Sequence, residues 1–327
     1  MSKKLSVIIV SYNTSDLLKQ CLTALYNSDL EEKTLEVFVV DNASADNSVE
    51  MVREEFPDVH LLPQSENLGF AAANNLAYRQ SSGDYIFLLN PDAQVEATAL
   101  RELTSYMEAH PACAIAGGRI MTADGNLAPS ARAFPGFVNR LLVLTGLSSR
   151  FPNSRFFGRP DMTYLDDSKP VDVDWVPGTF SCISRKMLDQ IGFFDERFFM
   201  YYEETDLCLR ANRNDWKVMF IPWARVWHVG GACSKTRKDM TFDSAGSQLL
   251  NYRLRSELLY WRKNFGFFPM VMNTGLEYAF NCLRALKNSM YGSSKKQKKQ
   301  ESIAFLKNAR AAFKDTKTGK QSPPAPW

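Results

Sequence analysis

The first ninety residues alternate between short apolar runs and longer amphipathic stretches. The apolar runs lie at 5–11, 36–41, 58–62 and 84–89. The amphipathic stretches, with apolar side chains at helical spacing, lie at 15–28, 45–56 and 70–82. Near-continuous apolar strands that alternate with helices are typical of βαβ units. The pattern therefore predicts an α/β fold with a mostly parallel, Rossmann-like sheet and flanking helices.

The pattern becomes irregular and then returns farther along the chain. Residues 123–172 contain five prolines and show little periodicity, which predicts a long insertion or loop region. Strand and helix signals resume after it, and from about residue 245 the pattern is helical and rich in aromatic residues and arginines. We expect one domain over 1–240 that includes this insertion, a helical extension over 241–292 and a weakly ordered basic tail over 293–327.

Composition narrows the class of protein. The chain of 327 residues is 45% hydrophobic and 23% charged, which is typical of a globular protein. Its six cysteines form no C-x-x-C pair and no zinc-ligand spacing, and the start MSKKLSVIIVSYN does not resemble a signal peptide. These features predict a protein of the reducing cytoplasm.

The net charge of +3 conceals an asymmetry between two parts of the chain. Residues 249–327 contain 15 Lys and Arg against 4 Asp and Glu, or +11, which leaves 24 basic and 32 acidic residues, or −8, in the rest. A basic C-terminal part predicts an anionic partner, either a membrane or a nucleic acid. The sequence contains no recognised nucleic-acid motif, and the acidic body argues against a broad phosphate footprint.

Polar residues follow the predicted strands at the point where each strand ends. In open parallel sheets ligands bind beyond these carboxyl ends. The polar groups are Ser11 to Asn13, Asp41 to Ser44, Glu66 to Phe70, and Asn90 to Asp92. Each alone could be a turn or a helix N-cap, but four at one edge of a sheet predict a binding crevice of nucleotide size.

The kind of phosphate site can be narrowed by elimination. No G-x-G-x-x-G follows the first strand, and no G-x-x-x-x-G-K-[ST] occurs, so neither a dinucleotide-binding oxidoreductase nor a P-loop enzyme is indicated. A nucleotidyltransferase would carry a glycine-rich, lysine-bearing signature near the first strand, which is also absent. A diphosphate would then need another charge partner, and a divalent cation, Mg²⁺ or Mn²⁺, held by a carboxylate at a strand tip is the obvious one.

The ordered series of motifs resembles family 2 inverting glycosyltransferases with the GT-A fold. It comprises SVIIVSYN, VVDNASADNS, ENLGFAAANN, LLNPDA, WVPGTFSCISR, FFMYYEETDLCLR and VWHVGG. The resemblance covers about residues 4–235 and is greatest to the bacterial rhamnosyltransferase-like enzymes of surface polysaccharide assembly. It implies a metal-dependent hexosyltransferase that moves a sugar from a pyrimidine nucleotide-sugar, with dTDP-L-rhamnose favoured, to a glycan or lipid-linked glycan acceptor such as O-antigen or cell-wall polysaccharide.

The resemblance also implies roles for individual residues. Asp41 would accept from the pyrimidine N–H, and the last aspartate of the family's D-x-D motif falls on Asp92, a metal ligand, although Asn90 replaces the first carboxylate. His228 is the second implied metal ligand; by itself it could be an ordinary packed histidine. The remaining nucleotide-sugar residues are Ser11, Asn13, Asn42, Ser44, Asn67, Gly69, Asn74 and Asn90.

The acidic motif supplies the expected general base. Glu204 stands at the position of the family's usual aspartate and would remove the acceptor proton, with Glu203 as the rival. Trp175 and Gly178 would receive the acceptor and donor sugars, although Trp175 could equally be a core residue. Asp206 is expected near the sugars or as a group that orients its neighbours.

The C-terminal part leaves alternatives open. Aromatic residues and arginines over 249–299 suit a helix that lies on the anionic inner face of the cytoplasmic membrane, or a helical hairpin packed inside the protein. UDP-hexoses or UDP-N-acetylhexosamines are alternative donors, and a homo-oligomer is left open. From other classes of function, the rivals are a non-catalytic nucleotide-sugar-binding protein and a nucleic-acid-binding protein that uses the basic tail.

Overall fold

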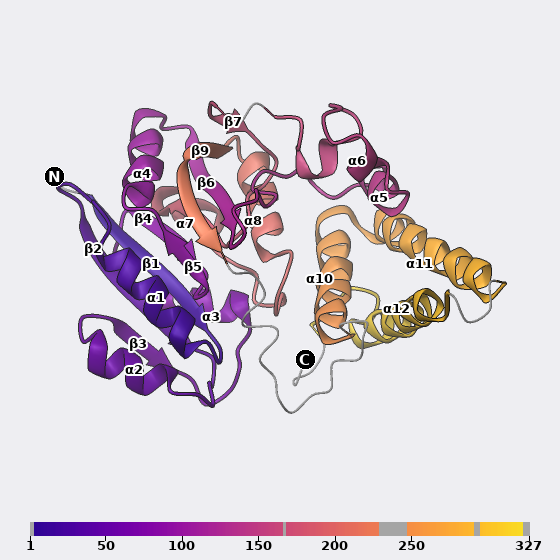
Figure 1. Ribbon diagram of the computed structural model, residues 1–327, viewed down its shortest axis with the longest axis horizontal. Coiled ribbons are helices and arrows are strands. Elements are labelled where there is room, and N and C mark those ends of the chain that lie inside the picture. Colours follow the sequence, from indigo (N-terminus) through magenta and orange to yellow (C-terminus); the bar gives the residue numbers. More distant parts are fainter. Residues whose placement is uncertain (1–2, 166–167, 229–246, 291–294, 323–327) are drawn as a thin grey trace. The chain divides into compact units, whose positions relative to one another are not determined.

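The computed structural model describes residues 3–165, 168–228, 247–290 and 295–322. The chain forms two compact units, each traced in Figure 1. The sheet unit comprises 1–134, 161–196 and 204–236, and the helical unit comprises 135–160, 197–203 and 237–327.

The sheet unit is built on a nine-stranded sheet. Its strands are β1 (Lys4–Ser11), β2 (Thr34–Asp41), β3 (His60–Pro63), β4 (Tyr85–Leu89), β5 (Ala93–Val95), β6 (Cys113–Thr122), β7 (Val171–Asp172), β8 (Phe180–Ser184) and β9 (Lys217–His228). The order is β3-β2-β1-β4-β8-β6-β9-β5, with β7 paired to β9. The pairings make β1, β2, β3, β4, β6 and β9 run in one direction, whereas β5, β7 and β8 run in the other. The predicted mostly parallel sheet is confirmed.

Helices connect the strands as the periodicity predicts. They are α1 (Ser15–Tyr26), α2 (Ser48–Glu55), α3 (Phe70–Gln80), α4 (Ala99–Ala109), α7 (Arg185–Ile191) and α8 (Glu203–Arg213). Leu5, Val7 and Ile9 alternate along β1 and join one core cluster with the buried faces of α1, α2 and α4. Because strand side chains alternate, the opposite face of β1 is also buried, and α3 packs against it.

The helical unit contains α5 (Phe137–Leu144), α6 (Leu147–Arg150), α10 (Ser247–Phe265), α11 (Phe267–Ser289) and α12 (Lys296–Asp315). The expectation of an irregular stretch over 123–172 is wrong for its middle part, because α5 is a helix that packs on α11. A short 3₁₀ turn, η1 (Arg159–Asp161), follows it. Residues 166–167 of this stretch lie outside the described residues.

The prediction of a weakly ordered tail is also wrong for its largest part. α12 is a helix of 20 residues, and Ser302, Phe305 and Ala312 are buried on one side of it. That side packs against α10 and α11, because spacings of three and seven residues place these side chains on one helix face. Residues 291–294 and 323–327 lie outside the described residues.

Buried charges tie α5, α10 and α11 together. The Arg140 guanidinium donates to the carboxylates of Glu257 and Glu277. Arg253 donates to the same two carboxylates, at 3.1 Å and 2.8 Å. Burial raises the pKa of Glu257, while the two arginines act in the opposite direction. Two cations thus balance two anions inside the helical unit, so removing one partner would leave a buried charge without its counter-charge.

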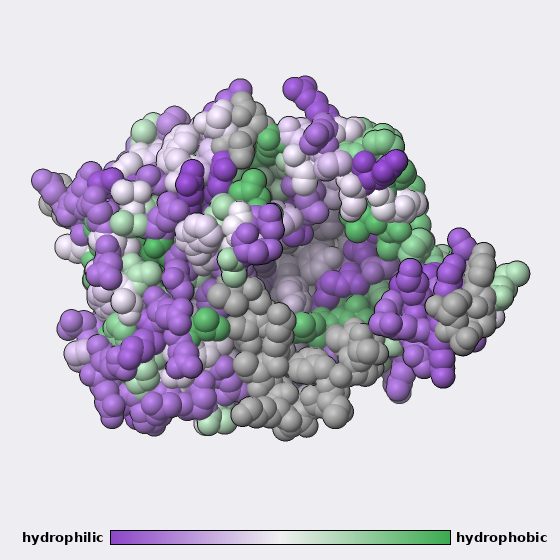
Figure 2. Space-filling view, in the orientation of Figure 1, coloured by the Kyte–Doolittle hydropathy of each residue, from purple (hydrophilic) through white to green (hydrophobic). Residues whose placement is uncertain are grey.

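Apolar side chains remain exposed on this unit. Of the two alternatives for the aromatic residues, packing inside the protein holds for Tyr252, Tyr260 and Trp261 of α10, which are buried, whereas Phe265 at the end of this helix is exposed. Most of the unit's exposed apolar residues lie on α5 and α11, and Figure 2 shows apolar surface gathered over α5 and the neighbouring part of α11. They are Phe137, Val138, Leu141, Val143, Phe267, Phe268, Val271, Met272, Leu283, Leu286 and, at the end of α11, Met290. Phe151, Phe156, Phe265, Ile303 and Phe313 are exposed elsewhere in the unit. In the described part of the chain, every helix is too short or too polar to cross a bilayer.

Candidate active site

The strand ends that carry the polar motifs lie at one edge of the sheet. Ser11 at the end of β1 pairs with Asp41 at the end of β2, which in turn pairs with Pro63 at the end of β3. β4, which is parallel to β1, ends immediately before Asn90. The predicted gathering of polar groups at the carboxyl edge is therefore confirmed for these four strands.

Backbone and side-chain hydrogen bonds connect the loops after β1 and β2. The Asn13 N–H donates to Ser44 Oγ at 2.9 Å, and Ala45 N–H donates to Asn13 Oδ1 at 2.7 Å. Asn13 and Ala43 have φ values of 53° and 62°, in the left-handed region that non-glycine residues seldom adopt. Backbone strain of this kind clusters at binding sites. The two loops are thus held in one defined conformation.

Asp41 is a buried carboxylate with an unused oxygen. Its Oδ2 accepts from Ser44 N–H at 2.9 Å, whereas Oδ1 is buried and finds no hydrogen-bond partner among the described residues. Burial raises the pKa of Asp41, and the nearby charges of Asp46 and Glu50 add to that effect. A buried acceptor that lacks a partner is costly unless a ligand supplies a donor. Asp41 therefore suits a ligand N–H.

Asparagines extend this group toward α3. Asn42 Nδ2 donates to the Gly69 carbonyl at 3.3 Å, and Asn67 Oδ1 accepts from Gly69 N–H at 2.9 Å. Gly69 has φ 82°, which explains why glycine stands before α3. Asn74, one turn into the helix, donates to the Phe70 carbonyl, and its Oδ1 has no hydrogen-bond partner in the described parts of the chain. Further buried acceptor atoms thus lie near the strand ends.

Asp92 and His228 form a pair beside the end of β4. His228 Nε2 lies 3.0 Å from Asp92 Oδ1 and 3.4 Å from Asn90 Nδ2. The register of β5 and β9 explains this proximity, because Ala93 pairs with His228. Asp92 is buried and His228 is partly exposed.

The Asp92 and His228 donors fit a divalent cation. Adjacent ligands of an octahedral ion with bonds of about 2.1 Å lie about 3 Å apart, and a carboxylate oxygen with an imidazole nitrogen suits Mn²⁺ or Mg²⁺. Across the described residues, no group of three or more His, Cys, Asp and Glu side chains could hold an ion alone. Beyond what the described residues offer, the pair would then need further ligands, as diphosphate oxygens could supply.

Trp175 and Gly178 lie on the segment that leads into β8. Trp175 Nε1 donates to the Ala133 carbonyl at 3.0 Å, and the Arg132 guanidinium lies 5.2 Å from the centre of the indole ring. Gly178 lies next to Thr179, whose carbonyl accepts from Asn90 N–H at 3.0 Å. This segment therefore adjoins the Asn90 end of β4, whereas Trp175 is held by an isolated β-bridge to Arg132.

The acidic motif begins α8. Glu203 is almost fully buried, with 3% of its surface exposed, whereas Glu204 is partly exposed. One turn later Cys208 lies against the backbone of Val176, which brings α8 next to the 175–178 segment. Asp206 is buried and accepts from Arg210 Nε at 2.9 Å, and Arg210 also donates to the carbonyls of residues 191–193. Among Glu203, Glu204 and Asp206, only Glu204 is partly exposed.

Two residues near these groups give no signal in the sequence. Arg132 packs on Trp175 and forms an ion pair with Asp161 at 3.3 Å, but it falls in the stretch that lacks periodicity. The Cys21 thiol donates to the Asn90 carbonyl at 3.5 Å, and burial raises its pKa far above the usual thiol range. Cys21 is therefore an uncharged packing residue beneath the Asn90 turn. Both positions depend on tertiary contacts that a linear pattern does not carry.

Known proteins with similar sequences transfer sugars. The N-acetylglucosaminyl-diphospho-decaprenol L-rhamnosyltransferase of Mycobacterium tuberculosis is 28% identical over 239 residues, which cover 70% of this chain and 76% of that protein. The dTDP-rhamnosyl transferase RfbF of Shigella flexneri is 25% identical over 270 residues, 81% of this chain and 82% of the relative.

Solved structures with the same fold include a mannosyltransferase from Pyrobaculum calidifontis in complex with GDP-Man and Mn²⁺. It superposes with a TM-score of 0.55 at 15% identity and covers 96% of this chain and 88% of its own. This likeness supports the GT-A fold. Residues 6–192 match the family described as glycosyl transferase family 2, which is more than half of the chain. The chain is therefore a glycosyltransferase and belongs to glycosyl transferase family 2.

Proposed function

We propose that this protein is an inverting, metal-dependent glycosyltransferase that uses dTDP-L-rhamnose as donor and a growing, lipid-linked bacterial surface glycan as acceptor. The observation that carries the proposal is the Asp92–His228 pair, which lies at the carboxyl edge of the sheet that also holds Asp41. Two relatives with rhamnosyltransferase names support the sugar, and one of those names contains a diphospho-decaprenol acceptor. UDP-hexoses and UDP-N-acetylhexosamines are the alternative donors.

In this proposal the strand-end residues bind the donor. The unpartnered Oδ1 of Asp41 accepts from the pyrimidine N–H, a hydrogen bond that thymine and uracil can donate and cytosine cannot. Ser11, Asn13, Asn42 and Ser44 shape this pocket, while Asn67, Gly69 and Asn74 line the path toward the diphosphate. Asp92 and His228 would hold Mg²⁺ or Mn²⁺, which as a Lewis acid stabilises charge on the leaving diphosphate.

Chemistry at the acceptor is assigned to the start of α8. Glu204 is partly exposed and would accept the proton of the acceptor hydroxyl while the oxygen attacks the anomeric carbon opposite the diphosphate. Inversion follows from this single displacement. Glu203 is the rival base, but its burial favours a role in fixing the helix start. Trp175 and Gly178 would receive the sugars, and Asp206 would support that region through Arg210.

The helical unit is proposed to rest on the anionic inner face of the membrane. Exposed apolar residues on α5 and α11, which include Phe268 and Leu283, support this partner. Basic residues at the start of α12, among them Lys295 and Lys299, would each add about 1 kcal/mol near an anionic surface. A second copy of the chain is the alternative partner for these exposed apolar residues. The membrane is favoured because the proposed acceptor is lipid-linked.

Calorimetric binding of a donor panel tests the proposed function. The panel contains dTDP-L-rhamnose, UDP-glucose, UDP-N-acetylglucosamine and GDP-mannose, each with and without Mn²⁺, on the native protein and on Asp92→Asn. We expect Mn²⁺-dependent binding of dTDP-L-rhamnose that exceeds the others by about tenfold and is lost in the variant. If a UDP-sugar binds most tightly, that sugar replaces dTDP-L-rhamnose as the assigned donor. If the folded protein binds none of these nucleotide-sugars, the proposal is overturned.

A further inference from the structure

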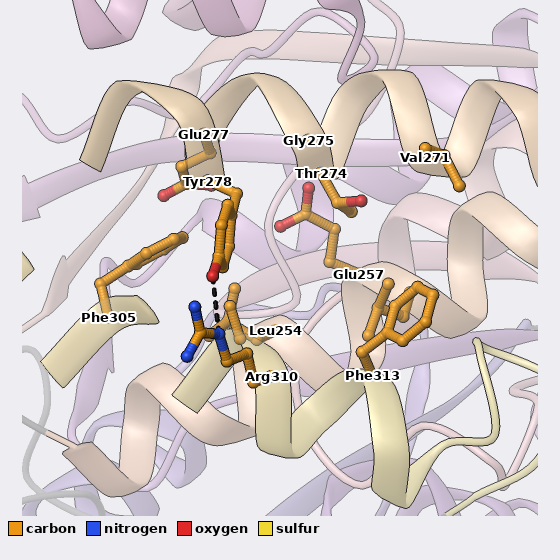
Figure 3. A pocket seen from close by; sticks show the side chains of 12 residues that line it. Leu254, Glu257, Val271, Thr274, Gly275, Glu277, Tyr278, Phe305, Arg310 and Phe313 are labelled. Atoms are coloured by element: carbon orange, nitrogen blue, oxygen red, sulfur yellow. Dashed lines mark hydrogen bonds between the residues drawn. The ribbon is translucent and has the colours of Figure 1, made fainter. Parts of the chain in front are cut away.

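The helical unit contains a cavity that the transfer reaction leaves unexplained. It has a volume of about 310 Å³ and lies between α10, α11 and α12 (Figure 3). The apolar part of its wall comes from all three helices and comprises Leu254, Leu258, Val271, Phe305, Ala309 and Phe313. A cavity of this size lies at the small end of ligand pockets, so it suits a piece of chain rather than a nucleotide-sugar.

The polar side chains in the wall are already occupied. Thr274 Oγ1 donates to the Met270 carbonyl at 2.7 Å, and the Glu257 and Glu277 carboxylates accept from Arg140 and Arg253. What remains for a ligand is mostly hydrocarbon. A mostly apolar wall favours the hydrocarbon part of a ligand, because contact with the wall removes apolar surface from water.

One cation stands at the rim. Arg310 is exposed, its Nε donates to Tyr278 Oη at 2.7 Å, and Figure 3 shows this pair at one side of the cavity, away from Phe313 and Val271. In the part of the chain that the structure describes, no carboxylate forms an ion pair with Arg310. The guanidinium can therefore attract an anionic head group while the hydrocarbon lies inside.

Gly275 keeps the wall of α11 open. It lies in the middle of a helix of 23 residues, where glycine is the least favourable residue after proline. A Cβ built on it would meet no atom within 4 Å, so close packing does not explain the glycine. Beside it, Val271 both lines the cavity and is 41% exposed on the apolar face of α11. The cavity and the proposed membrane face thus share one stretch of helix.

From these features we infer that the cavity holds a segment of the isoprenoid chain of the lipid-linked acceptor, with its phosphate near Arg310. The inference rests on the proposed lipid-linked acceptor and assigns to the helical unit a lipid-binding site. A chain that leaves the bilayer beside Val271 would enter between α11 and α12, so the acceptor would be held by its lipid as well as by its sugar.

Displacement of a fluorescent fatty acid, dansyl-undecanoic acid, tests this site on the full-length protein. The competitors are farnesyl phosphate, farnesol and inorganic phosphate. We expect farnesyl phosphate and farnesol to displace the probe at a single saturable site, and inorganic phosphate to leave it bound. Arg310→Gln should lower the affinity for farnesyl phosphate by about tenfold and leave the affinity for farnesol unchanged. Absence of saturable displacement would overturn the inference.

Matched variants separate occupancy of the cavity from loss of fold. Gly275→Leu adds a side chain beside the cavity, and it should stabilise α11 because leucine favours a helix more than glycine does. Ala309→Phe fills the cavity from the side of α12. Each of these two substitutions should lower the affinity for farnesyl phosphate by about tenfold or more, whereas Gly275→Ala should change this affinity by less than about threefold. Binding by Gly275→Leu and Ala309→Phe at native strength would overturn the site. Asp92→Asn should still bind farnesyl phosphate, and Gly275→Leu should still bind the nucleotide-sugar. The proposed function and the proposed lipid site can therefore be disproved independently of each other.

Discussion

His228 Nε2 lies 3.0 Å from Asp92 Oδ1, although 136 residues separate the two along the chain. The antiparallel pairing of β5 with β9 creates this contact, because it places His228 opposite Ala93. A carboxylate and an imidazole are thereby fixed beside the end of β4, the strand that pairs with β1. This contact is why the site is expected to depend on a cation.

Removal of either member of the pair should weaken Mn²⁺ binding. Asp92→Asn and His228→Gln each delete one proposed ligand, and we expect Mn²⁺ affinity in the presence of dTDP to fall by about tenfold or more. Electron paramagnetic resonance of free Mn²⁺ measures this without any turnover. The matched control is His110→Gln, which changes an exposed histidine at the end of α4. Equal Mn²⁺ affinity in all four proteins would contradict the assigned ligands.

Conservative variants at the start of α8 should identify the base. Glu204→Gln should lower kcat by about 10²–10⁴-fold with donor binding intact, because proton transfer of this kind contributes that much. Glu203→Gln, at a side chain with 3% exposure, should act mainly on stability, seen as a lower Tm, with kcat much less affected. The reverse pattern in kcat would transfer the role of base to Glu203.

Binding of the nucleobase should depend on the ionisation of Asp41. The pKa of Asp41 is raised, first by burial, so its carboxyl group takes up a proton at a higher pH than an ordinary aspartate. The ionised form accepts the thymine N–H, and affinity should therefore fall as pH decreases through this raised pKa. Thymidine is the suitable probe, because it carries no titrating phosphate, and its Kd can be followed by calorimetry.

Asp41→Asn provides the control for this titration. It should bind thymidine about 10- to 100-fold more weakly at neutral pH, since a hydrogen bond to a charged group contributes about 1.5–3 kcal/mol. The remaining affinity of this variant for thymidine should also no longer fall as the pH is lowered. A native protein whose thymidine affinity stays level down to the pH of acid unfolding would show that Asp41 does not contact the base.

The local patterns of the sequence predict the sheet unit well. Apolar runs and helical spacing identify β1 to β4 and α1 to α3, since a parallel sheet buried on both faces needs near-continuous apolar strands. The turn residues at the strand ends, from Ser11 to Asp92, follow from the topology of such a sheet. What the patterns cannot give is the pairing of β9 with β5, because strand partners distant in the chain are selected by packing in three dimensions.

The helical unit is harder to predict because its sequence signals are mixed. The buried side of α11 contains Asn273 and Asn281, whereas Phe268 and Leu283 are exposed. The usual assumption that apolar residues point inward therefore fails there. In the sequence α12 is a lysine-rich, polar stretch. Its few apolar residues can be identified as buried only once α10 and α11 are seen to pack against them.

Breaking the buried charge cluster should destabilise the helical unit. Arg140→Met leaves Glu257 and Glu277 with Arg253 alone, and loss of one partner of a buried ion pair costs about 3–5 kcal/mol. Urea unfolding followed by circular dichroism measures this free energy. The double variant Arg140→Met with Glu257→Leu should be less destabilised than Arg140→Met alone, because it removes the excess negative charge. Additive effects of the two substitutions would argue against a coupled cluster.

Polar substitutions on the exposed face of α11 should reduce membrane binding. Phe268, Leu283 and Leu286 are 79%, 67% and 66% exposed, so changing all three to serine should leave the folded state intact. Burial of each in lipid is worth about 1.5–3 kcal/mol, and we expect the partition coefficient onto phosphatidylglycerol vesicles to fall by about tenfold or more. Flotation with the vesicles measures it, with Leu127→Ser, an exposed site on the sheet unit, as control. If the triple variant floats like the native protein but changes its sedimentation from dimer to monomer, the face binds a second copy of the chain and not the bilayer.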